Sequence, residues 1–300
     1  MALTDAKLNR IHRFGAVQRV MGILLMIFSL TMLPPMAVSW LYADGTAPAF
    51  ALALSINVVL GALTWWPVRH SRAELKIRDG FLVTVLFWMV LGVSGAIPLY
   101  VADQPGLTIP QAVFESISGL TTTGATVIVG LDGLPKAMLY YRQQLQWFGG
   151  MGLVILAIAI LPMLGVGGMQ LYRAESLGPV KDTKLTPRLV ETARALWLIY
   201  LSLTIACAVA YRWAGMDWFD AIGHAFATVS TGGFSTHDAS IAYFDSAIIE
   251  LICIAFMVIG AVNFGLHFVA FRSRSITGYW SDPEFRVFIG IIAAATLGIT

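Results

Sequence analysis

The stretch IPQAVFESISGLTTTGAT at residues 109–126 decides how this chain folds. Its first twelve residues are apolar enough to enter a membrane, but about 20 are needed to cross one. The TTTGAT that follows is a β-branched run interrupted by glycine, which is poor helix material. The pattern predicts a short half-helix that enters a membrane and returns as extended chain. Such backbone is tolerated at that depth only where it lines a watery cavity or is buried in protein.

A second stretch of the same kind, WFDAIGHAFATVSTGGFS, occupies residues 218–235. Superposing Gly124 on Gly232 sets the two copies 108 residues apart, aligns Thr123 with Thr231, and makes the second half-helix about one turn longer. Internal repeats with interrupted apolar segments point to a pore or transport site at their interface. A single Thr-Gly turn would favour a surface loop, but two copies, each behind a segment too short to span, favour a pore.

The composition around these stretches is that of a membrane protein. The 300 residues are 58 % hydrophobic and 12 % charged, whereas soluble domains carry about 25 % charge. This argues against a soluble enzyme and against a disordered chain. Backbone groups in lipid must be satisfied internally, so apolar runs of spanning length are expected to be helices. Six runs are long enough: 20–42, 48–68, 81–102, 143–165, 195–213 and 246–270. A seventh begins near Phe285.

Lysine and arginine gather on one side of these predicted spans. Sixteen of the nineteen lie in four segments: 7–19, 69–78, 173–194 and 272–286. The positive-inside rule places these segments and the N-terminus in the cytoplasm. The net charge is only +2, and the absence of a basic stripe argues against nucleic acid as a partner.

The residue types of the two turns suit a monovalent cation. Successive carbonyls of an extended Thr-Thr-Gly chain can replace a hydration shell, and glycine permits backbone angles that β-branched residues resist. Gly124 and Gly232 carry no carboxylate, which Ca²⁺ and Mg²⁺ usually recruit. Two acids on the half-helices, Glu115 and Asp220, have two open interpretations: they attract cations at an outer mouth, or they cap and orient backbone.

Other polar residues are given structural interpretations. Arg142, near the outer end of the fourth span, is expected to extend to the membrane interface, and a barrier or counter-charge role near the pore is the open alternative. Asn263, in mid-span, is expected to hydrogen-bond another helix, and the glycines of 149–152 are expected to allow close helix packing. Three histidines are too far apart in the sequence to predict a metal site: His224, His237 and His267.

Five motifs together resemble one known family. They are TTTGAT at 121–126, QWFGGMG at 146–152, ILPMLGVGGMQLYRAE at 160–175, GPVKD at 178–182 and STGGFSTHD at 230–238. The combination is similar to the Trk/Ktr/HKT potassium transporters and, within them, to membrane subunits of bacterial Trk potassium-uptake systems. The resemblance implies an all-α polytopic membrane protein, in which repeated helix–pore half-helix–helix units surround a central pore after an extra N-terminal helix pair.

The resemblance also implies a division of the chain. The expected parts are an N-terminal helix pair at 1–78, a first pore repeat at 79–188, a second at 189–275, and the start of a truncated third at 276–300. Members of the family carry four repeats on longer chains, so the sequence is expected to be truncated at its C-terminus.

Potassium, as the transported ion, would then be bound by carbonyls of the two turns. The implied filter residues are Thr122, Thr123, Gly124, Ser230, Thr231 and Gly232. No cofactor is expected in this chain. The implied partners are a cytoplasmic nucleotide-binding regulatory subunit, a second copy in a homodimer, and the lipid bilayer. The implied location is the bacterial cytoplasmic membrane, with the N-terminus in the cytoplasm.

The function predicted from these observations is potassium uptake through a carbonyl-lined filter, and not an enzymatic activity. Two alternatives stay open: a non-transporting fragment or assembly partner that needs the missing repeats, and a transporter for another cation such as sodium. A membrane enzyme would need converging acids, histidines or a nucleophile, and a carrier for other solutes would need ionisable groups in mid-membrane. The sequence offers neither, and it leaves open whether flux is channel-like or coupled to H⁺ or Na⁺.

Overall fold

A computed structural model describes residues 2–70, 77–150, 152 and 186–299. These ranges are helical and contain no strand. The α-helices are α1 (Ala2–Ser29), α2 (Leu33–Tyr42), α3 (Ala47–Trp65), α4 (Ile77–Val101), α5 (Ile109–Leu120), α6 (Lys136–Gly150), α9 (Thr186–Trp213), α10 (Trp218–Val229), α11 (Ala247–Ala261), α12 (Phe264–Ser273), α13 (Thr277–Ser281) and α14 (Pro283–Ile299). Short 3₁₀ turns occur at Leu30–Met32, Trp66–Val68, Leu131–Gly133 and Ser240–Phe244.

Hydropathy predicts four of the long spans correctly. Four helical segments of the described chain are long and apolar enough to cross a membrane: Phe14–Tyr42, Ala47–Val68, Leu82–Val101 and Arg194–Trp213. They confirm the first, second, third and fifth predicted spans. A 3₁₀ turn interrupts the first of them just before Pro34 and Pro35, because proline lacks the N–H that a helix interior requires.

The predicted span 246–270 is wrong as a single straight helix. α11 and α12 meet at an angle of 92°, and Asn263 lies at the break, where its side chain accepts the amide of Gly265 at 2.9 Å. Asn263 therefore caps α12 instead of bonding another helix. The predicted span 143–165 starts earlier, with α6, and its remainder lies outside the described residues, as do the motifs at 160–175 and 178–182.

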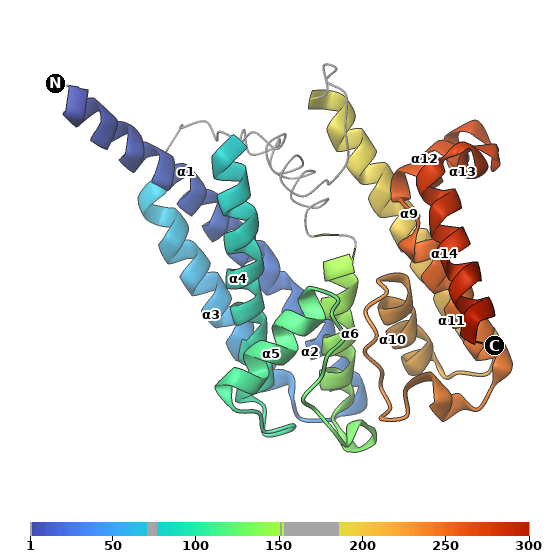
Figure 1. Ribbon diagram of the computed structural model, residues 1–300. Helices are drawn as coiled ribbons and strands as arrows, with labels where there is room; N and C mark the ends of the chain where they lie inside the picture. The colour runs from blue at the N-terminus through green and yellow to red at the C-terminus, as the bar shows by residue number, and fades with distance from the viewer. Residues whose placement is uncertain (1, 71–76, 151, 153–185, 300) are drawn as a thin grey trace.

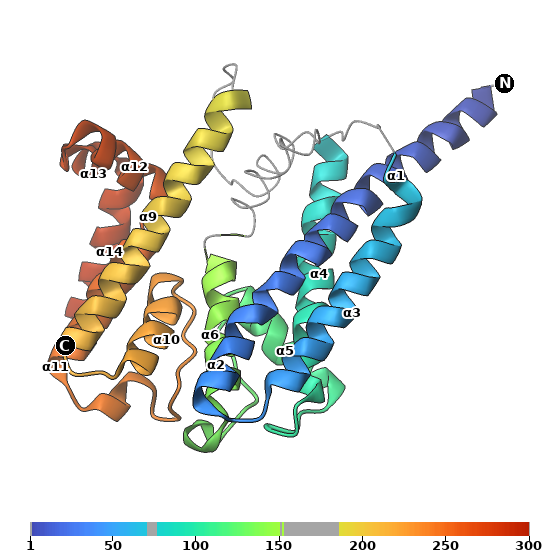
Figure 2. The same ribbon diagram turned by 180° about the vertical axis from the view of Figure 1, so that it is seen from behind.

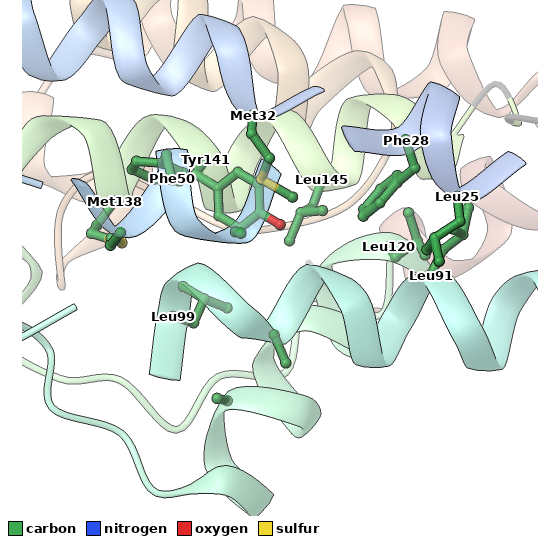
Figure 3. Packing of buried hydrophobic residues seen from close by; sticks show 14 of the residues in the cluster. Leu25, Phe28, Met32, Phe50, Leu91, Leu99, Leu120, Met138, Tyr141 and Leu145 are labelled. Atoms are coloured by element: carbon green, nitrogen blue, oxygen red, sulfur yellow. The ribbon is translucent and has the colours of Figure 1, made fainter. Parts of the chain in front are cut away.

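The elements form two groups that lie side by side in Figures 1 and 2. α1 to α6 make one group and α9 to α14 the other, and α6 and α10 are in contact across the boundary. Apolar side chains of the first group share one core, shown in Figure 3. Leu120, the last residue of α5, is fully buried in that core with Leu91 and Leu145. The inner end of the half-helix is therefore anchored by apolar burial.

Glycines bring α1 and α3 into close contact. A β-carbon on Gly22 would lie 2.8 Å from the carbonyl oxygen of Gly61, and one on Gly61 would lie 2.6 Å from Cγ of Met26. Small residues permit such approach between helices in membranes. We expect Gly61→Leu to destabilise the protein by about 1–3 kcal/mol through overpacking, measured as thermal unfolding in detergent. Ser55→Leu, on an exposed position of the same helix, is the control, and equal stability of the two variants would contradict the prediction.

Candidate ion-binding site

The two half-helices lie on either side of α6 (Figure 2). Each has 12 residues. The prediction that the second half-helix is about one turn longer is therefore wrong. Both starts are capped: the amide of Thr108 donates to Oε1 of Gln111 at 2.9 Å, and the carboxylate of Asp217 accepts the amide of Asp220 at 2.7 Å. Each half-helix therefore starts at a residue fixed by a side-chain cap.

α5 and α10 end in the same hydrogen-bonded turn. In each, two amides beyond the helix donate back to carbonyls of its last turn, which is a Schellman motif. The donors and acceptors are Thr122 to Gly119 and Thr123 to Ser118 in the first turn, and Thr231 to Thr228 and Gly232 to Ala227 in the second. Equivalent atoms stand 109 residues apart, so the superposition by 108 is wrong by one residue. Thr123 corresponds to Gly232, and Gly124 corresponds to Gly233.

Backbone angles agree with this register. Thr122 and Thr231 have φ of 54° and 53°, and Gly124 and Gly233 have φ of 74° and 88°. A side chain in this left-handed region costs about 1–2 kcal/mol, and such strain concentrates at functional sites. β-Branched residues resist such angles, yet Thr122 and Thr231 both adopt them here. Gly232 has no positive φ, so the requirement for glycine at this position has a different reason.

The two turns meet through their backbones. A β-carbon added to Gly124 would lie 2.2 Å from the carbonyl oxygen of Gly232 and 3.5 Å from Cα of Gly233. Gly124 therefore has no room for a side chain toward the second turn. Of the predicted ion-binding residues, the structure brings Gly124 and Gly232 into direct contact, although more than 100 residues separate them in the sequence.

Several carbonyls of these turns are free to accept a ligand. Within the described residues, no donor lies on the carbonyl oxygens of Thr122, Thr123, Gly124, Thr231 and Gly233. The predicted ligands Ser230 and Gly232 differ, because their carbonyls accept Oγ1 of Thr231 at 2.7 Å and Nε2 of Gln146 at 2.6 Å. Unpaired backbone oxygens are costly away from water, so a cation or water would satisfy them. The negative ends of two helix dipoles also lie at these turns and favour a cation.

Glu115 and Arg142 form a buried ion pair next to the first turn. Nε of Arg142 lies 2.8 Å from Oε1 of Glu115, and the side chains are 1 % and 0 % exposed. Glu115 also accepts the amide of Val127 at 3.0 Å, and Arg142 donates to the carbonyl of Ser235 at 3.3 Å. Glu115 is thus buried and holds the backbone of Val127 in place. The expectation that Arg142 extends to the interface is wrong, because a carboxylate neutralises it in place.

Asp220 is also buried, and it helps to join the two repeats. The ring of His237 lies between two aspartates: its Nε2 is 3.2 Å from Oδ2 of Asp220, and its Nδ1 hydrogen-bonds Oδ1 of Asp132. The hydrogen bond from His237 holds the pKa of Asp132 below its ordinary value. His224 stacks near His237 at 6.5 Å between ring centroids, so these two histidines are close together, while His267 lies apart in α12. In the described part of the chain, no group of three or more His, Cys, Asp or Glu side chains has the arrangement needed to hold a metal ion.

Glycines at the end of α6 allow the close packing that the sequence predicts. A β-carbon on Gly149 would lie 1.9 Å from the carbonyl oxygen of Leu120, and one on Gly150 would lie 2.5 Å from Cβ of Ser230. α6 therefore touches the start of both turns. Sequence reasoning missed Gln146 on the same helix, although a glutamine within an apolar run was a usable signal.

Comparison with known proteins gives one consistent family. A family model described as "TrkH: Cation transport protein" matches residues 46–300. The Trk system potassium uptake protein TrkH of Halomonas elongata is 62 % identical over 284 residues, which cover 95 % of this chain and 59 % of that protein. TrkH of Escherichia coli K12 is 58 % identical over 278 residues, which cover 93 % of this chain and 58 % of that protein.

A solved structure has the same fold. The crystal structure of the potassium transporter TrkH from Vibrio parahaemolyticus matches with a TM-score of 0.81 and 55 % identity, covering 93 % of this chain and 57 % of that one. The chain therefore spans less than two thirds of the length of the relatives that it matches.

Proposed function

Because the chain belongs to the TrkH family of cation transport proteins, we propose that it carries the first two pore repeats of a potassium-uptake protein. The observation that carries this proposal is the contact between two Schellman turns that leave carbonyl oxygens unpaired. Potassium, stripped of part of its hydration shell, would be bound by these neutral oxygens. The relatives from Halomonas and Escherichia coli are named as potassium uptake proteins, which supports this choice of ion.

The proposed ligands follow the register of the structure. In the first turn, the proposed ligands are the carbonyls of Thr122, Thr123 and Gly124. Their counterparts in the second turn are the carbonyls of Thr231, Gly232 and Gly233, of which those of Thr231 and Gly233 are the proposed ligands. Ser230 and Gly232 would shape the second turn, because their carbonyls already accept a hydrogen bond. Neutral oxygens without a carboxylate suit an alkali cation better than a divalent one.

We propose that the parts of the chain have the boundaries expected from the sequence. The helix pair would occupy 1–78, the pore repeats 79–188 and 189–275, and the start of a third repeat 276–300. The extra helix pair is supported by the packing of α1 and α3 against α4. The likeness of α5 and α10, together with their following turns, supports the two repeats.

The chain is a helical membrane protein of several spans. We propose that it lies in the bacterial cytoplasmic membrane and assembles with partner proteins. The lysine and arginine bias supports a cytoplasmic N-terminus in the bacterial cytoplasmic membrane. The relatives are named as parts of a Trk system, which supports assembly with other Trk proteins. A cytoplasmic nucleotide-binding subunit and a homodimer are the finer forms of that proposal.

Uptake measurements test the proposed function. Cells without their own potassium-uptake systems, carrying the complete reading frame that contains this sequence, are expected to accumulate potassium and to grow in low-potassium medium, unlike cells with an empty vector. Sodium uptake in its place would favour the other-cation alternative. Folded protein in the membrane without uptake of either ion would favour an assembly partner and overturn the proposal.

A further inference from the structure

Gln146 is a fully buried residue of α6 that reaches into the other repeat. Nε2 of Gln146 donates to the carbonyl oxygen of Gly232 at 2.6 Å, and its Oε1 accepts the amide of Phe234 at 3.0 Å. Both ends of one amide are therefore used. The orientation of the group is fixed as well, because a flipped amide would place a donor against the Phe234 amide.

Gly232 is shaped to admit this side chain. A β-carbon on Gly232 would lie 2.4 Å from Cδ and 2.5 Å from Oε1 of Gln146. Since Gly232 has no positive φ, space for Gln146 is what requires glycine here. The neighbouring Gly233 needs glycine for its backbone angle instead, so the two adjacent glycines have separate causes.

The carbonyl that Gln146 binds is the one that faces the first turn. The oxygen of Gly232 is 2.2 Å from where a β-carbon of Gly124 would be, so this oxygen forms the contact between the two turns. Its position is set by a hydrogen bond from a rigid helix and not by the turn alone. A shift of Gly232 would change the spacing between carbonyls on the two sides.

This arrangement is not a general feature of the repeats. Gln146 is the eleventh residue of the 15-residue helix that follows the first turn, and Met257 is the eleventh residue of the 15-residue helix that follows the second. A thioether offers no N–H donor and only a weak acceptor. The amide at 146 therefore serves the contact between first and second turn specifically.

We propose that Gln146 is a positioning residue for ion selectivity: it fixes the Gly232 carbonyl against Gly124 and so sets the width of the opening between the two turns. The proposal rests on the proposed function in that the ions discriminated are potassium and sodium. Gln146 acts through the turn, and the ion itself is bound by the free carbonyls.

Gln146→Leu tests this proposal, because leucine keeps the bulk and removes both hydrogen bonds. Expressed from the complete reading frame, it is expected to lower the ratio of potassium to sodium uptake about tenfold, which corresponds to about 1.4 kcal/mol. Gln144→Leu is the matched control, since Gln144 is a buried glutamine of the same helix whose hydrogen bond goes to the carbonyl of Thr31 at 2.7 Å. An unchanged ratio in Gln146→Leu would overturn the proposal.

A second measurement does not depend on transport. Hydrogen exchange at the amide of Phe234, followed in purified protein, is expected to accelerate in Gln146→Leu and not in Gln144→Leu. Absence of wild-type uptake would count against the proposed function, whereas unchanged exchange in Gln146→Leu would overturn the role of Gln146.

Discussion

Gly124→Ser is expected to reduce the preference for potassium over sodium by at least about tenfold, or about 1.4 kcal/mol. The residue has φ of 74°, which costs a serine about 1–2 kcal/mol. Its β-carbon would also lie 2.2 Å from the oxygen of Gly232, where ordinary contact begins at 3.4 Å. The two turns must separate to admit it, and the spacing of their carbonyls changes. Ion fluxes through the variant, compared with the wild type in the same cells, measure the effect.

Gly130 separates the two causes of this effect. It has the same φ of 74°, but a β-carbon there would meet nothing within 4 Å. Gly130→Ser therefore carries the backbone strain without the clash and is expected to keep its selectivity. If Gly124→Ser folds and discriminates potassium from sodium as well as Gly130→Ser does, the proposed place of Gly124 in the filter is wrong.

The amino-acid sequence alone does not determine which glycine of the second repeat corresponds to Gly124. Superposing Gly124 on Gly232 aligns two Thr-Gly pairs, and it is the natural choice from the sequence. The structure aligns amide–carbonyl bonds instead, and these relate Gly124 to Gly233. STGGFS contains two glycines in a row, and only the backbone shows that one of them provides a positive φ and the other provides space.

The sequence predicts elements well where one local property decides them. The length of an apolar run is enough to predict four spans. An apolar run too short to cross a membrane, followed by β-branched residues, is enough to predict α5. The break at Asn263 and the ion pair of Glu115 with Arg142 depend on other parts of the chain. An arginine near the end of a span extends to the interface unless a carboxylate meets it in the interior, and 27 residues separate the two partners. Such pairings are fixed by tertiary packing and cannot be inferred from one segment.

Removing the arginine of this ion pair is expected to have the largest effect on stability. Arg142→Ala leaves the Glu115 carboxylate buried without its countercharge, which costs about 3–5 kcal/mol. The guanidinium also lies 4.4 Å from the centroid of the Phe234 ring, so the variant loses contacts to both repeats. We expect a sharp fall in thermal stability in detergent and in the yield of folded protein.

Arg212→Ala is a suitable control, because Arg212 is exposed near the end of α9, where it donates to the carbonyl of Met216 and lies over the ring of Trp218. Loss of exposed charge interactions costs about 0–1 kcal/mol. The double variant Glu115→Gln/Arg142→Gln removes both charges and keeps polar side chains, so it is expected to recover most of the stability lost in Arg142→Ala. Since Glu115 also holds the amide of Val127, full recovery is not expected. Equal stability of Arg142→Ala and Arg212→Ala would show that the buried pair does not fix the first turn against the second.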